Sequence, residues 1–217
     1  FQYFAYILAN KLNTRYELLY ELIYAKNKNN LIKSIKKINK NINLGLFNQG
    51  GLKNKISIIA GAGSGFGKGI ACRFSDEGAK VVIADINREA AEIVTAEIGE
   101  NALAVTCDVS QNGDVSAMFE RTLKHWGRLD ILVNNAGTTH RNKPMTEVSE
   151  EEFDQIFAVN VKSVFLTAKH GIPLMKKQGH GVILNVASTA GLRPRPGLAW
   201  YNTSKGAMIT ATKAMAI

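Results

Sequence analysis

Short runs of apolar, often β-branched residues alternate along most of the chain with longer segments in which apolar residues recur every three or four positions. The short runs predict strands, and the longer segments predict helices. The predicted strands are Ile56–Ala60, Lys80–Ala84, Ala102–Cys107, Asp130–Val133 and Val182–Ala187. The predicted helices lie near residues 65–77, 88–98, 113–126, 149–176 (where two helices can follow one another) and 200–216.

The predicted strands are apolar on both faces, which is typical of a parallel sheet covered by helices on each side. Strands and helices also alternate along the chain, as in a series of βαβ units. The sequence therefore predicts a doubly wound α/β fold with three layers, α/β/α, of the Rossmann type. In the first helix Phe66, Ile70 and Phe74 are spaced by four residues, and we expect this apolar stripe to pack in the core.

Residues 1–50 differ in composition from the rest of the 217-residue chain. They contain nine Asn and three Ala, whereas residues 51–217 contain ten Asn and twenty-one Ala. We therefore expect a basic, Asn/Lys-rich N-terminal extension at 1–50 and a separate domain at 51–217. The extension fits a targeting segment, a basic arm or a spacer without a function of its own. Four isoleucines at helical spacing predict a short amphipathic helix within it, namely Ile32, Ile35, Ile38 and Ile42.

Charge and cysteine content exclude several classes of protein. The extension holds eight Lys or Arg against two Glu, a charge of +6, and the remaining residues hold nineteen against sixteen, a charge of +3. Nucleic-acid binding is therefore not expected of the main body. No run approaches the roughly 18 apolar residues of a membrane-spanning helix. The two cysteines and four scattered histidines predict a reducing compartment, the cytoplasm, and no metal site.

A glycine cluster follows the first predicted strand and opens the first predicted helix. The phosphate loop of nucleoside triphosphate hydrolases requires Ser or Thr after the lysine, but Gly69 follows Lys68 here. Gly61, Gly65 and Gly67 instead form the pattern G-x-x-x-G-x-G. Glycines at such a turn let the backbone approach a pyrophosphate, which the helix N-terminus stabilises. A plain strand–helix turn is the alternative interpretation.

Two aspartates follow the next two predicted strands. Asp85 can accept hydrogen bonds from both hydroxyls of an adenosine ribose and would repel a 2′-phosphate, which favours NAD over NADP. The alternative is a helix N-cap or turn residue, and the nearby Arg88 can weaken the discrimination. Asp108 fits either a contact with the adenine edge or a cap of the helix that begins near Gly113.

Tyr201 and Lys205 are four residues apart in a predicted helix, so they share one face of it. Lowering the pKa of a tyrosine from about 10 to about 7 requires roughly 4 kcal/mol of differential stabilisation. An ammonium one helical turn away supplies part of this because it favours the phenolate. Ser188 follows the fifth predicted strand, where such folds bind ligands, and its hydroxyl can orient a carbonyl or an alcohol. Each residue taken alone is also typical of a helix or turn surface.

Taken together, these motifs resemble the short-chain dehydrogenase/reductase family from about Leu52 to Ile217. The resemblance implies that the domain at 51–217 is an NAD(P)-binding Rossmann domain of this family, though an incomplete one. The resemblance implies four catalytic residues: Asn160, Ser188, Tyr201 and Lys205. It implies that Tyr201 is the general acid/base, that Lys205 lowers its pKa and holds the nicotinamide ribose, and that Ser188 orients the substrate. Asn160 would hold a water that links Lys205 to solvent. The implied cofactor-binding residues are Gly61, Ser64, Gly65, Phe66, Gly67, Asp85, Asp108, Val109, Asn135, Ala136, Gly137, Tyr201 and Lys205, and Asn134 would brace the central strands.

The chain departs from the family pattern in two respects. Ala60 stands where the family usually has a threonine before the first glycine, so a hydroxyl that ties the turn to the neighbouring strand is missing. Family members also continue for a further strand, helix and strand beyond the helix that starts near Trp200. We therefore expect a truncated sheet and an incomplete substrate pocket in this chain.

The resemblance implies an oxidoreductase that transfers hydride between NAD(H) and a small alcohol or carbonyl substrate. The alternatives are a catalytically incompetent, truncated nucleotide-binding remnant and an NADP enzyme similar to 3-oxoacyl-carrier-protein reductases. We expect no nucleic-acid or membrane partner, and a homo-oligomer, typically a tetramer, for the complete protein. Arg193 and Arg195 precede Tyr201 and fit either an anionic substrate or a solvated loop.

Overall fold

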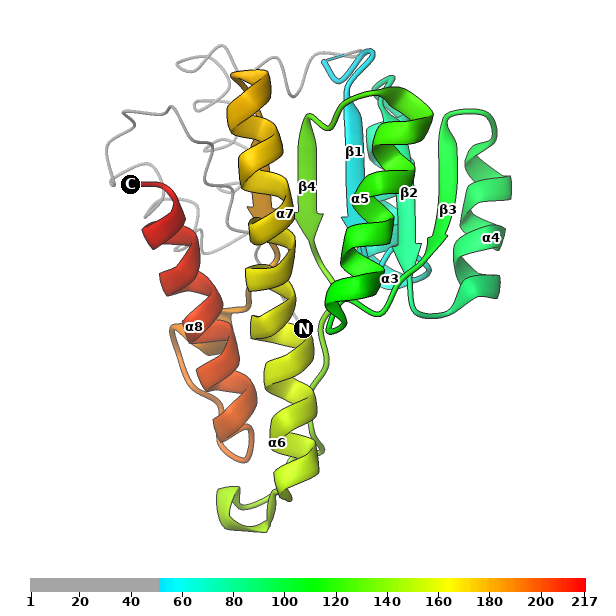
Figure 1. Ribbon diagram of the computed structural model, residues 1–217. Coiled ribbons are helices and arrows are strands. Elements are labelled where there is room, and N and C mark those ends of the chain that lie inside the picture. Colours follow the sequence, from blue (N-terminus) through cyan, green and yellow to red (C-terminus); the bar gives the residue numbers. More distant parts are fainter. Residues whose placement is uncertain (1–50) are drawn as a thin grey trace, which may run out of the picture.

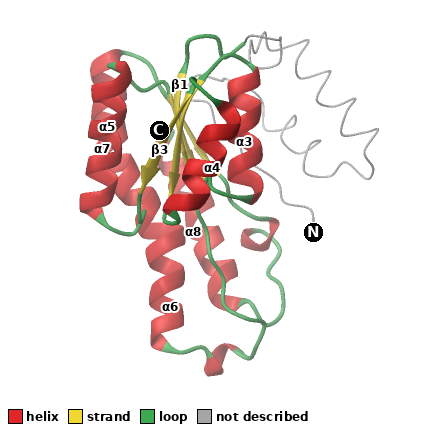
Figure 2. Cartoon of the chain, turned by 90° about the vertical axis from the view of Figure 1, so that its right-hand side faces the viewer, coloured by secondary structure: helices red, strands yellow, loops and turns green. Residues whose placement is uncertain are grey.

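A sheet of five parallel strands, in the order β3-β2-β1-β4-β5, forms the middle layer of the protein. The structure, a computed structural model, describes residues 51–217. Helices cover both faces of the sheet (Figures 1 and 2), which confirms the predicted doubly wound α/β fold. The predicted N-terminal extension and its short helix lie outside the described residues.

The observed elements agree closely with the predicted ones. The strands are β1 (Ile56–Ala60), β2 (Lys80–Asp85), β3 (Ala102–Thr106), β4 (Ile131–Asn134) and β5 (Val182–Asn185). The long helices are α3 (Gly65–Asp76), α4 (Arg88–Ile98), α5 (Asn112–Trp126), α6 (Glu150–Phe157), α7 (Ser163–Gln178) and α8 (Ala199–Met215). Short helical segments are η1 (Met145–Glu147), η2 (Ala158–Lys162) and η3 (Thr189–Gly191).

The fifth strand is shorter than predicted. It ends at Asn185 rather than Ala187, because its register partner Asn134 is the last residue of β4. Val186 still donates its backbone N–H to the Asn134 carbonyl at 2.9 Å, but no strand continues beyond that point. Among the described residues β5 pairs only with β4, so it lies at the edge of this sheet.

The strands are apolar throughout because each face of the sheet packs against helices. All five residues of β1 are buried, and successive side chains enter different core clusters. Ile58 packs with residues of α5 and α7, whereas Ile59 packs with residues of α3 and α4. Figure 2 shows these two helical layers on opposite sides of the sheet. The continuous apolar runs in the sequence are thus explained by burial on both faces.

The apolar stripe predicted for the first helix is only partly correct. Ile70 and Phe74 are partly buried and pack against the core, but the Phe66 side chain is 59% exposed. Phe66 is the second residue of α3 and lies just after the turn that leaves β1. At that point the helix has not yet reached the face of the sheet, so helical spacing alone overestimates the length of the buried stripe.

The long helical segment predicted for 149–176 consists of α6 and α7, joined by the π-helical segment η2. A capping box formed by Ser149 and Glu152 fixes the start of α6. A π-helical turn inserts an extra residue into the helix and is frequent at functional sites. Here it contains Asn160, one of the predicted catalytic residues. Within residues 51–217, no helix combines the length and the apolar character needed to span a lipid bilayer.

Candidate active site

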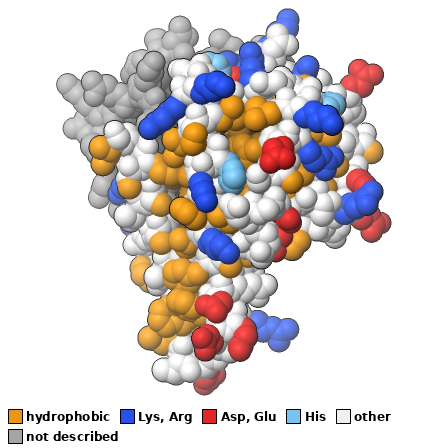
Figure 3. Space-filling model, in the orientation of Figure 1, with side chains coloured by type: hydrophobic (Ala, Val, Ile, Leu, Met, Phe, Trp, Pro, Cys, Tyr) orange, Lys and Arg blue, Asp and Glu red, His pale blue; other side chains and the backbone are white. Residues whose placement is uncertain are grey.

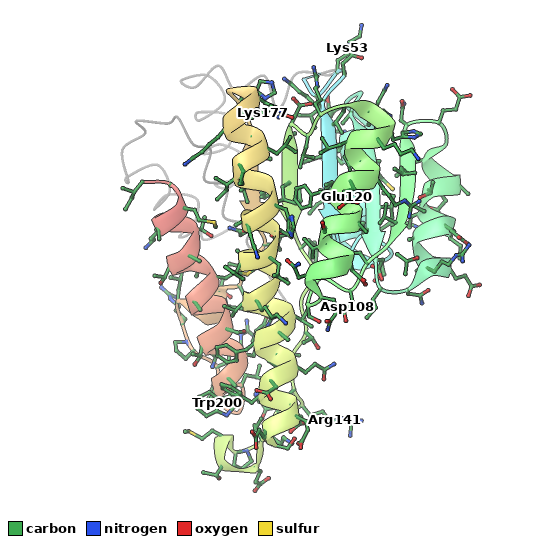
Figure 4. All side chains as sticks on the ribbon, viewed as in Figure 1. Lys53, Asp108, Glu120, Arg141, Lys177 and Trp200 are labelled. Carbon is green, nitrogen blue, oxygen red and sulfur yellow. The ribbon has the colours of Figure 1, made fainter. Side chains whose placement is uncertain are left out.

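The segments that follow the five strands meet at one edge of the sheet, because parallel strands have their carboxyl ends on the same side. This edge is the lower one in Figure 1, and the labelled Asp108 marks it in Figure 4. The lower parts of α6 and α8 extend past this edge. The candidate residues at or just after the strand ends are the turn 61–67, Asp85, Asp108, the segment 135–137 and Ser188.

Close backbone packing requires the glycines of the first turn. Gly61 has φ +68°, and a Cβ on it would lie 2.8 Å from the Cα of Ala136. A Cβ on Gly67 would lie 2.0 Å from the carbonyl oxygen of Gly61. The Asn135 side chain donates to the carbonyls of Ala60 and Gly61 at 3.1 and 3.0 Å. This amide therefore ties the turn to β4, although the hydroxyl expected before the first glycine is absent.

The start of α3 fits an anionic ligand. Its N-cap Ser64 makes no side-chain capping bond, and its first turn contains no acidic residue. Gly65 has φ +55° and open space where a side chain would be, while Ser64 and Phe66 are exposed. A helix N-terminus of this kind presents backbone N–H groups and the positive end of the helix dipole. The pyrophosphate of a dinucleotide is a ligand that this cradle suits.

The Asp85 carboxylate faces the glycine turn and also binds its backbone. Its Oδ2 accepts from the N–H of Gly63 at 2.8 Å, and its Oδ1 accepts from the N–H of Asn87 at 2.9 Å. The N-cap of α4 is Asn87, whose side chain accepts from the N–H of Ala90, so Asp85 is not the helix cap. An ionised carboxylate has about four acceptor positions, and two remain for a ribose.

Asp108 and Val109 differ in what they offer to a nucleotide. Asp108 Oδ1 accepts from the N–H and the hydroxyl of Ser110 at 2.9 and 2.7 Å. The N-cap of α5 is Gln111, so Asp108 shapes a turn and is not the cap that the sequence allowed. The Val109 side chain is 6% exposed and belongs to the core cluster, which leaves little of it within reach of a nucleotide.

Tyr201 and Lys205 occupy one face of α8. The Lys205 Nζ lies 6.0 Å from the centroid of the Tyr201 ring, and the Lys205 side chain is almost fully buried. Its Nζ donates to the carbonyl of Val186 at 3.1 Å. Burial penalises the charged form, which lowers the pKa of Lys205 from 10.5 to about 8.

Three segments meet beside Lys205. A Cβ on Gly137 would lie 3.2 Å from Lys205 Nζ and 3.3 Å from Asn160 Oδ1, so the absence of a side chain at Gly137 leaves room next to both groups. Asn160 is fully buried and binds both backbone polar groups of Thr138, accepting at 2.8 Å and donating at 2.9 Å. It also donates to the hydroxyl of Ser204 on α8 at 2.9 Å.

Ser188 is buried and is the N-cap of η3, and its Oγ accepts from the N–H of Ala190 at 3.1 Å. The hydroxyl hydrogen remains a donor, because a serine hydroxyl both donates and accepts. Ser188 lies near the start of the segment that connects β5 to α8, and Tyr201 lies in the first turn of α8.

Sequence reasoning missed a buried polar connection between the sheet and α8. Asn134 donates to Asn185 Oδ1 at 2.8 Å, and Asn185 donates to the hydroxyl of Thr212 at 2.9 Å. Asn134 thus braces β4 against β5, as the resemblance implied, whereas the extension of the connection to α8 through Asn185 was not predicted. A polar residue at the end of the apolar run of β5 was the only signal for this role in the sequence.

A cavity of about 590 Å³ lies beside α8, between the loop before α6 and the loop before α8. The α8 residues that line it are Ala199, Asn202, Thr203 and Gly206. At 100° per residue, these side chains lie on a different face of the helix from Tyr201 and Lys205. Arg195 lines this cavity too. The cavity is therefore separate from the tyrosine–lysine face.

A family model described as short chain dehydrogenase matches residues 55–217. The chain belongs to the short-chain dehydrogenase family. The 4-formylbenzenesulfonate dehydrogenase of Comamonas testosteroni is 48% identical over 169 residues, which cover 76% of this chain and 67% of that protein. The 2-(R)-hydroxypropyl-CoM dehydrogenase of Xanthobacter autotrophicus is 38% identical, with 76% and 68% covered.

Crystal structures of family members share the fold. A 3-ketoacyl-(acyl-carrier-protein) reductase from Brucella melitensis, complexed with NADH, superposes with a TM-score of 0.74 at 50% identity, covering 76% of this chain and 69% of that one. An NAD⁺-bound xylitol dehydrogenase superposes with a TM-score of 0.73 at 32% identity, covering 76% and 64%. The chain spans about two thirds of the length of the relatives it matches. It is thus an oxidoreductase-family chain whose neighbours bind nicotinamide dinucleotides.

Proposed function

We propose that this protein interconverts an alcohol and a carbonyl compound with NAD(H), using Ser188, Tyr201, Lys205 and Asn160. The observation that carries the proposal is the placement of Lys205. Its buried ammonium lies 6.0 Å from the Tyr201 ring centroid, on the face of α8 that both residues share. It also lies beside Asn160. Burying a lysine there is unfavourable for stability, and such perturbed groups cluster at functional sites.

The chemistry divides between the cofactor and the chain. A bound nicotinamide dinucleotide supplies the hydride acceptor or donor. In oxidation, the Tyr201 phenolate takes the hydroxyl proton of the alcohol as the carbon loses its hydride, and in reduction the Tyr201 hydroxyl returns a proton to the carbonyl oxygen. Ser188 donates a hydrogen bond to the reacting oxygen and holds it near Tyr201.

Lys205 makes the tyrosine a usable base. With a pKa of about 8, most Lys205 side chains carry a charge at pH 7. This charge favours the phenolate form of Tyr201 and lowers its pKa. Asn160 is held by Thr138 and Ser204, so its carboxamide is fixed next to the space above Gly137. A water in that space would connect Lys205 with solvent.

The preference for NAD rests on Asp85, which is the last residue of β2 and accepts hydrogen bonds from two backbone N–H groups. The two structural relatives contain NADH and NAD⁺. The first of them is a 3-ketoacyl reductase, so a preference for NAD does not argue against that substrate class. The 48% identical relative acts, by its name, on an aromatic aldehyde with a sulfonate group.

Two substrate classes follow from these relatives, aromatic aldehydes or alcohols and 3-oxoacyl thioesters. A panel with 4-formylbenzenesulfonate, its alcohol and acetoacetyl-CoA distinguishes them by kcat/KM. The protein for this assay is expressed from the complete reading frame of its gene. Homo-oligomerisation and a cytoplasmic location stay predictions, and sedimentation velocity tests the first of them.

The mechanism is tested with Tyr201→Phe, which keeps the ring and removes the titrating hydroxyl. We expect turnover to fall by at least about 10³-fold, since it removes the general acid/base, while the Kd for NADH, measured by fluorescence, changes less than threefold. Thr210→Val, an exposed position on the same helix, is the matched control. Equal kcat for Tyr201→Phe and the parent would refute the mechanism. NADH binding without turnover of any substrate would instead favour the catalytically incompetent remnant.

A further inference from the structure

The segment before α8 is held by an unusual set of side-chain contacts. We propose that Asn142 and Asn202 are positioning residues for Tyr201. Their side chains bind the turn at 195–197 from two sides, an arrangement called the grip, and so fix the position of Tyr201. The inference rests on the proposed function, because it concerns how the catalytic tyrosine is located relative to Ser188.

The connection between Ser188 and Tyr201 has little structure of its own. Beyond η3, residues 192–196 are all exposed and form neither helix nor strand. Pro194 and Pro196 have no backbone N–H, so this turn has few donors with which to hold itself. Within the turn the N–H of Leu198 donates to the carbonyl of Arg195 at 3.3 Å, and further donors come from other parts of the chain.

Three consecutive carbonyls of this turn are bound by such donors. The side chain of Asn202 donates to the carbonyl of Arg195 at 2.9 Å. The side chain of Asn142 donates to the carbonyl of Pro196 at 2.8 Å. The backbone N–H of Lys143 donates to the carbonyl of Gly197 at 3.1 Å. Asn202 comes from the first turns of α8, and Asn142 comes from the loop between β4 and α6, so the turn is held from both sides.

Gly197 and Asn142 fit each other closely. Gly197 has φ +72°, and a Cβ on it would lie 2.0 Å from Asn142 Oδ1 and 2.5 Å from Asn142 Cγ. The carboxamide of Asn142 therefore occupies the space that a side chain at Gly197 would need. A glycine at this position permits both the left-handed backbone and the approach of the asparagine.

Further contacts fix the residue next to Tyr201. Trp200 Nε1 donates to the carbonyl of Met145 at 3.3 Å, and its ring packs edge-on against Phe153 with centroids 5.2 Å apart. Figure 4 shows Trp200 at the lower end of α8 and Arg141, a residue of the loop between β4 and η1, beside the lower part of α6. In Figure 3 apolar side chains gather over the first turns of α8, with acidic side chains beside them over the start of α6.

The loop that supplies Asn142 is itself anchored. Lys143 Nζ lies 2.6 Å from Glu152 Oε2, and Glu152 also belongs to the capping box at the start of α6. The grip thus connects the start of α6 to the start of α8, so the position of α8 depends on that of α6. None of the polar contacts of Asn142 and Asn202 described above involves the glycine turn or Asp85, so loss of the grip should disturb Tyr201 and leave cofactor binding intact.

The first test is kinetic and uses the protein expressed from its complete reading frame. Asn142→Asp removes the donor at constant size, and Asn202→Ala removes the buried amide. Since a misplacement of about 1 Å can reduce turnover about 100-fold, we expect kcat to fall about 10-fold for Asn142→Asp and up to about 100-fold for Asn202→Ala. The Kd for NADH should stay within twofold. Asn101→Asp, an exposed position between α4 and β3, makes the same charge change and should alter neither value.

A second readout does not require turnover. This readout uses the 217-residue chain, which has two tryptophans, so a Trp126→Phe background leaves Trp200 as its only indole. In that background we expect Asn202→Ala and Asn142→Asp to shift the Trp200 emission to longer wavelength and to increase its quenching by acrylamide. Asn101→Asp should leave both unchanged.

A third variant tests the pairing of Asn142 with Gly197. Gly197→Ala alone should lower kcat because its methyl group meets the carboxamide of Asn142. Adding Asn142→Ala removes that collision, so the double variant should lose less than the two single variants combined.

The outcomes separate the two proposals. Unchanged Trp200 emission and kcat within twofold for Asn142→Asp and Asn202→Ala would overturn the positioning role. A proportional loss of NADH binding would overturn it too, because it would indicate general unfolding. If the parent protein turned over no substrate, the proposed function would fail, and the emission of Trp200 would still decide whether the grip exists.

Discussion

Lys205 should destabilise the folded protein at neutral pH. Its pKa falls from 10.5 to about 8 because its ammonium is buried. The difference corresponds to roughly 3 kcal/mol of unfavourable free energy for the charged form in the folded state. Lys205→Met keeps the length of the side chain and removes the charge. It also leaves the Val186 carbonyl without its donor, which costs about 1 kcal/mol.

The net expectation is that Lys205→Met is more stable than the parent by about 2 kcal/mol below pH 8, or about 4–8 °C in Tm for a domain of this size. The advantage depends on pH. Below pH 8 the lysine is charged in both states, so the full penalty is present. Between pH 8 and 10.5 the unfolded lysine keeps a proton that the folded one has lost, so the parent gains stability as pH rises. The variant cannot titrate there, so its advantage should vanish at about pH 9.5, and the variant should be less stable than the parent by about 1 kcal/mol near pH 10.5.

Urea unfolding of the parent and the variant at half-unit steps from pH 6.5 to 10 measures this difference. Lys213→Met, an exposed position on the same helix, is the control, and its effect should stay within about 0.5 kcal/mol at every pH. A variant less stable than the parent at pH 7, or a difference that does not change with pH, would refute the reasoning. The variant should also lose turnover, so the substitution should raise stability at neutral pH and lower activity.

Two further predictions concern Asp85 and the cysteines. Asp85→Ser should raise the affinity for NADPH relative to NADH, because it removes the charge that repels a 2′-phosphate. It should also weaken NADH binding, because the N–H of Gly63 loses its acceptor. Tighter binding of NADPH than of NADH by the parent would contradict this. Cys107 should resist iodoacetamide at pH 8 in the folded protein, since burial, followed by the charges of Asp114 and Asp108, raises its pKa to about 12. Mass spectrometry should find label on the partly exposed Cys72 first, and equal labelling of both would contradict the burial of Cys107.

The sequence predicted the elements well because their hydrophobic patterns are local. Runs such as Ile56–Ala60 are buried on both faces, and their helices follow at regular spacing. The misses lie where tertiary position decides. Phe66 matched a helical stripe but lies beyond the sheet, and the strand at Val182 ends early because its neighbour β4 ends at Asn134. Neither result is encoded in the spacing of apolar residues.

For the candidate site, the sequence identified residue types and order, but not their partners. The spacing of Tyr201 and Lys205 predicted that they share a helix face, and the structure places them so. Asn135 was expected only to lie against a cofactor, yet its amide is engaged by the glycine turn. The sequence allowed a turn role for Asp85, which accepts from the N–H of Asn87, but it did not reveal that Asp85 also binds the N–H of Gly63 in the glycine turn. Such contacts join residues far apart in the chain, and single-sequence patterns do not report them.

The placement of α8 depends on polar contacts within a largely apolar interface. Ser204 and Thr212 are eight residues apart and lie on one face of the helix, and they receive hydrogen bonds from Asn160 and Asn185. Apolar packing alone would tolerate a small rotation of α8, because it has no directional preference. Two buried hydrogen bonds at fixed points along the helix oppose such a rotation, because it would leave both donors unsatisfied. The same face carries Lys205, so these contacts hold an unfavourably buried charge at one position relative to the sheet.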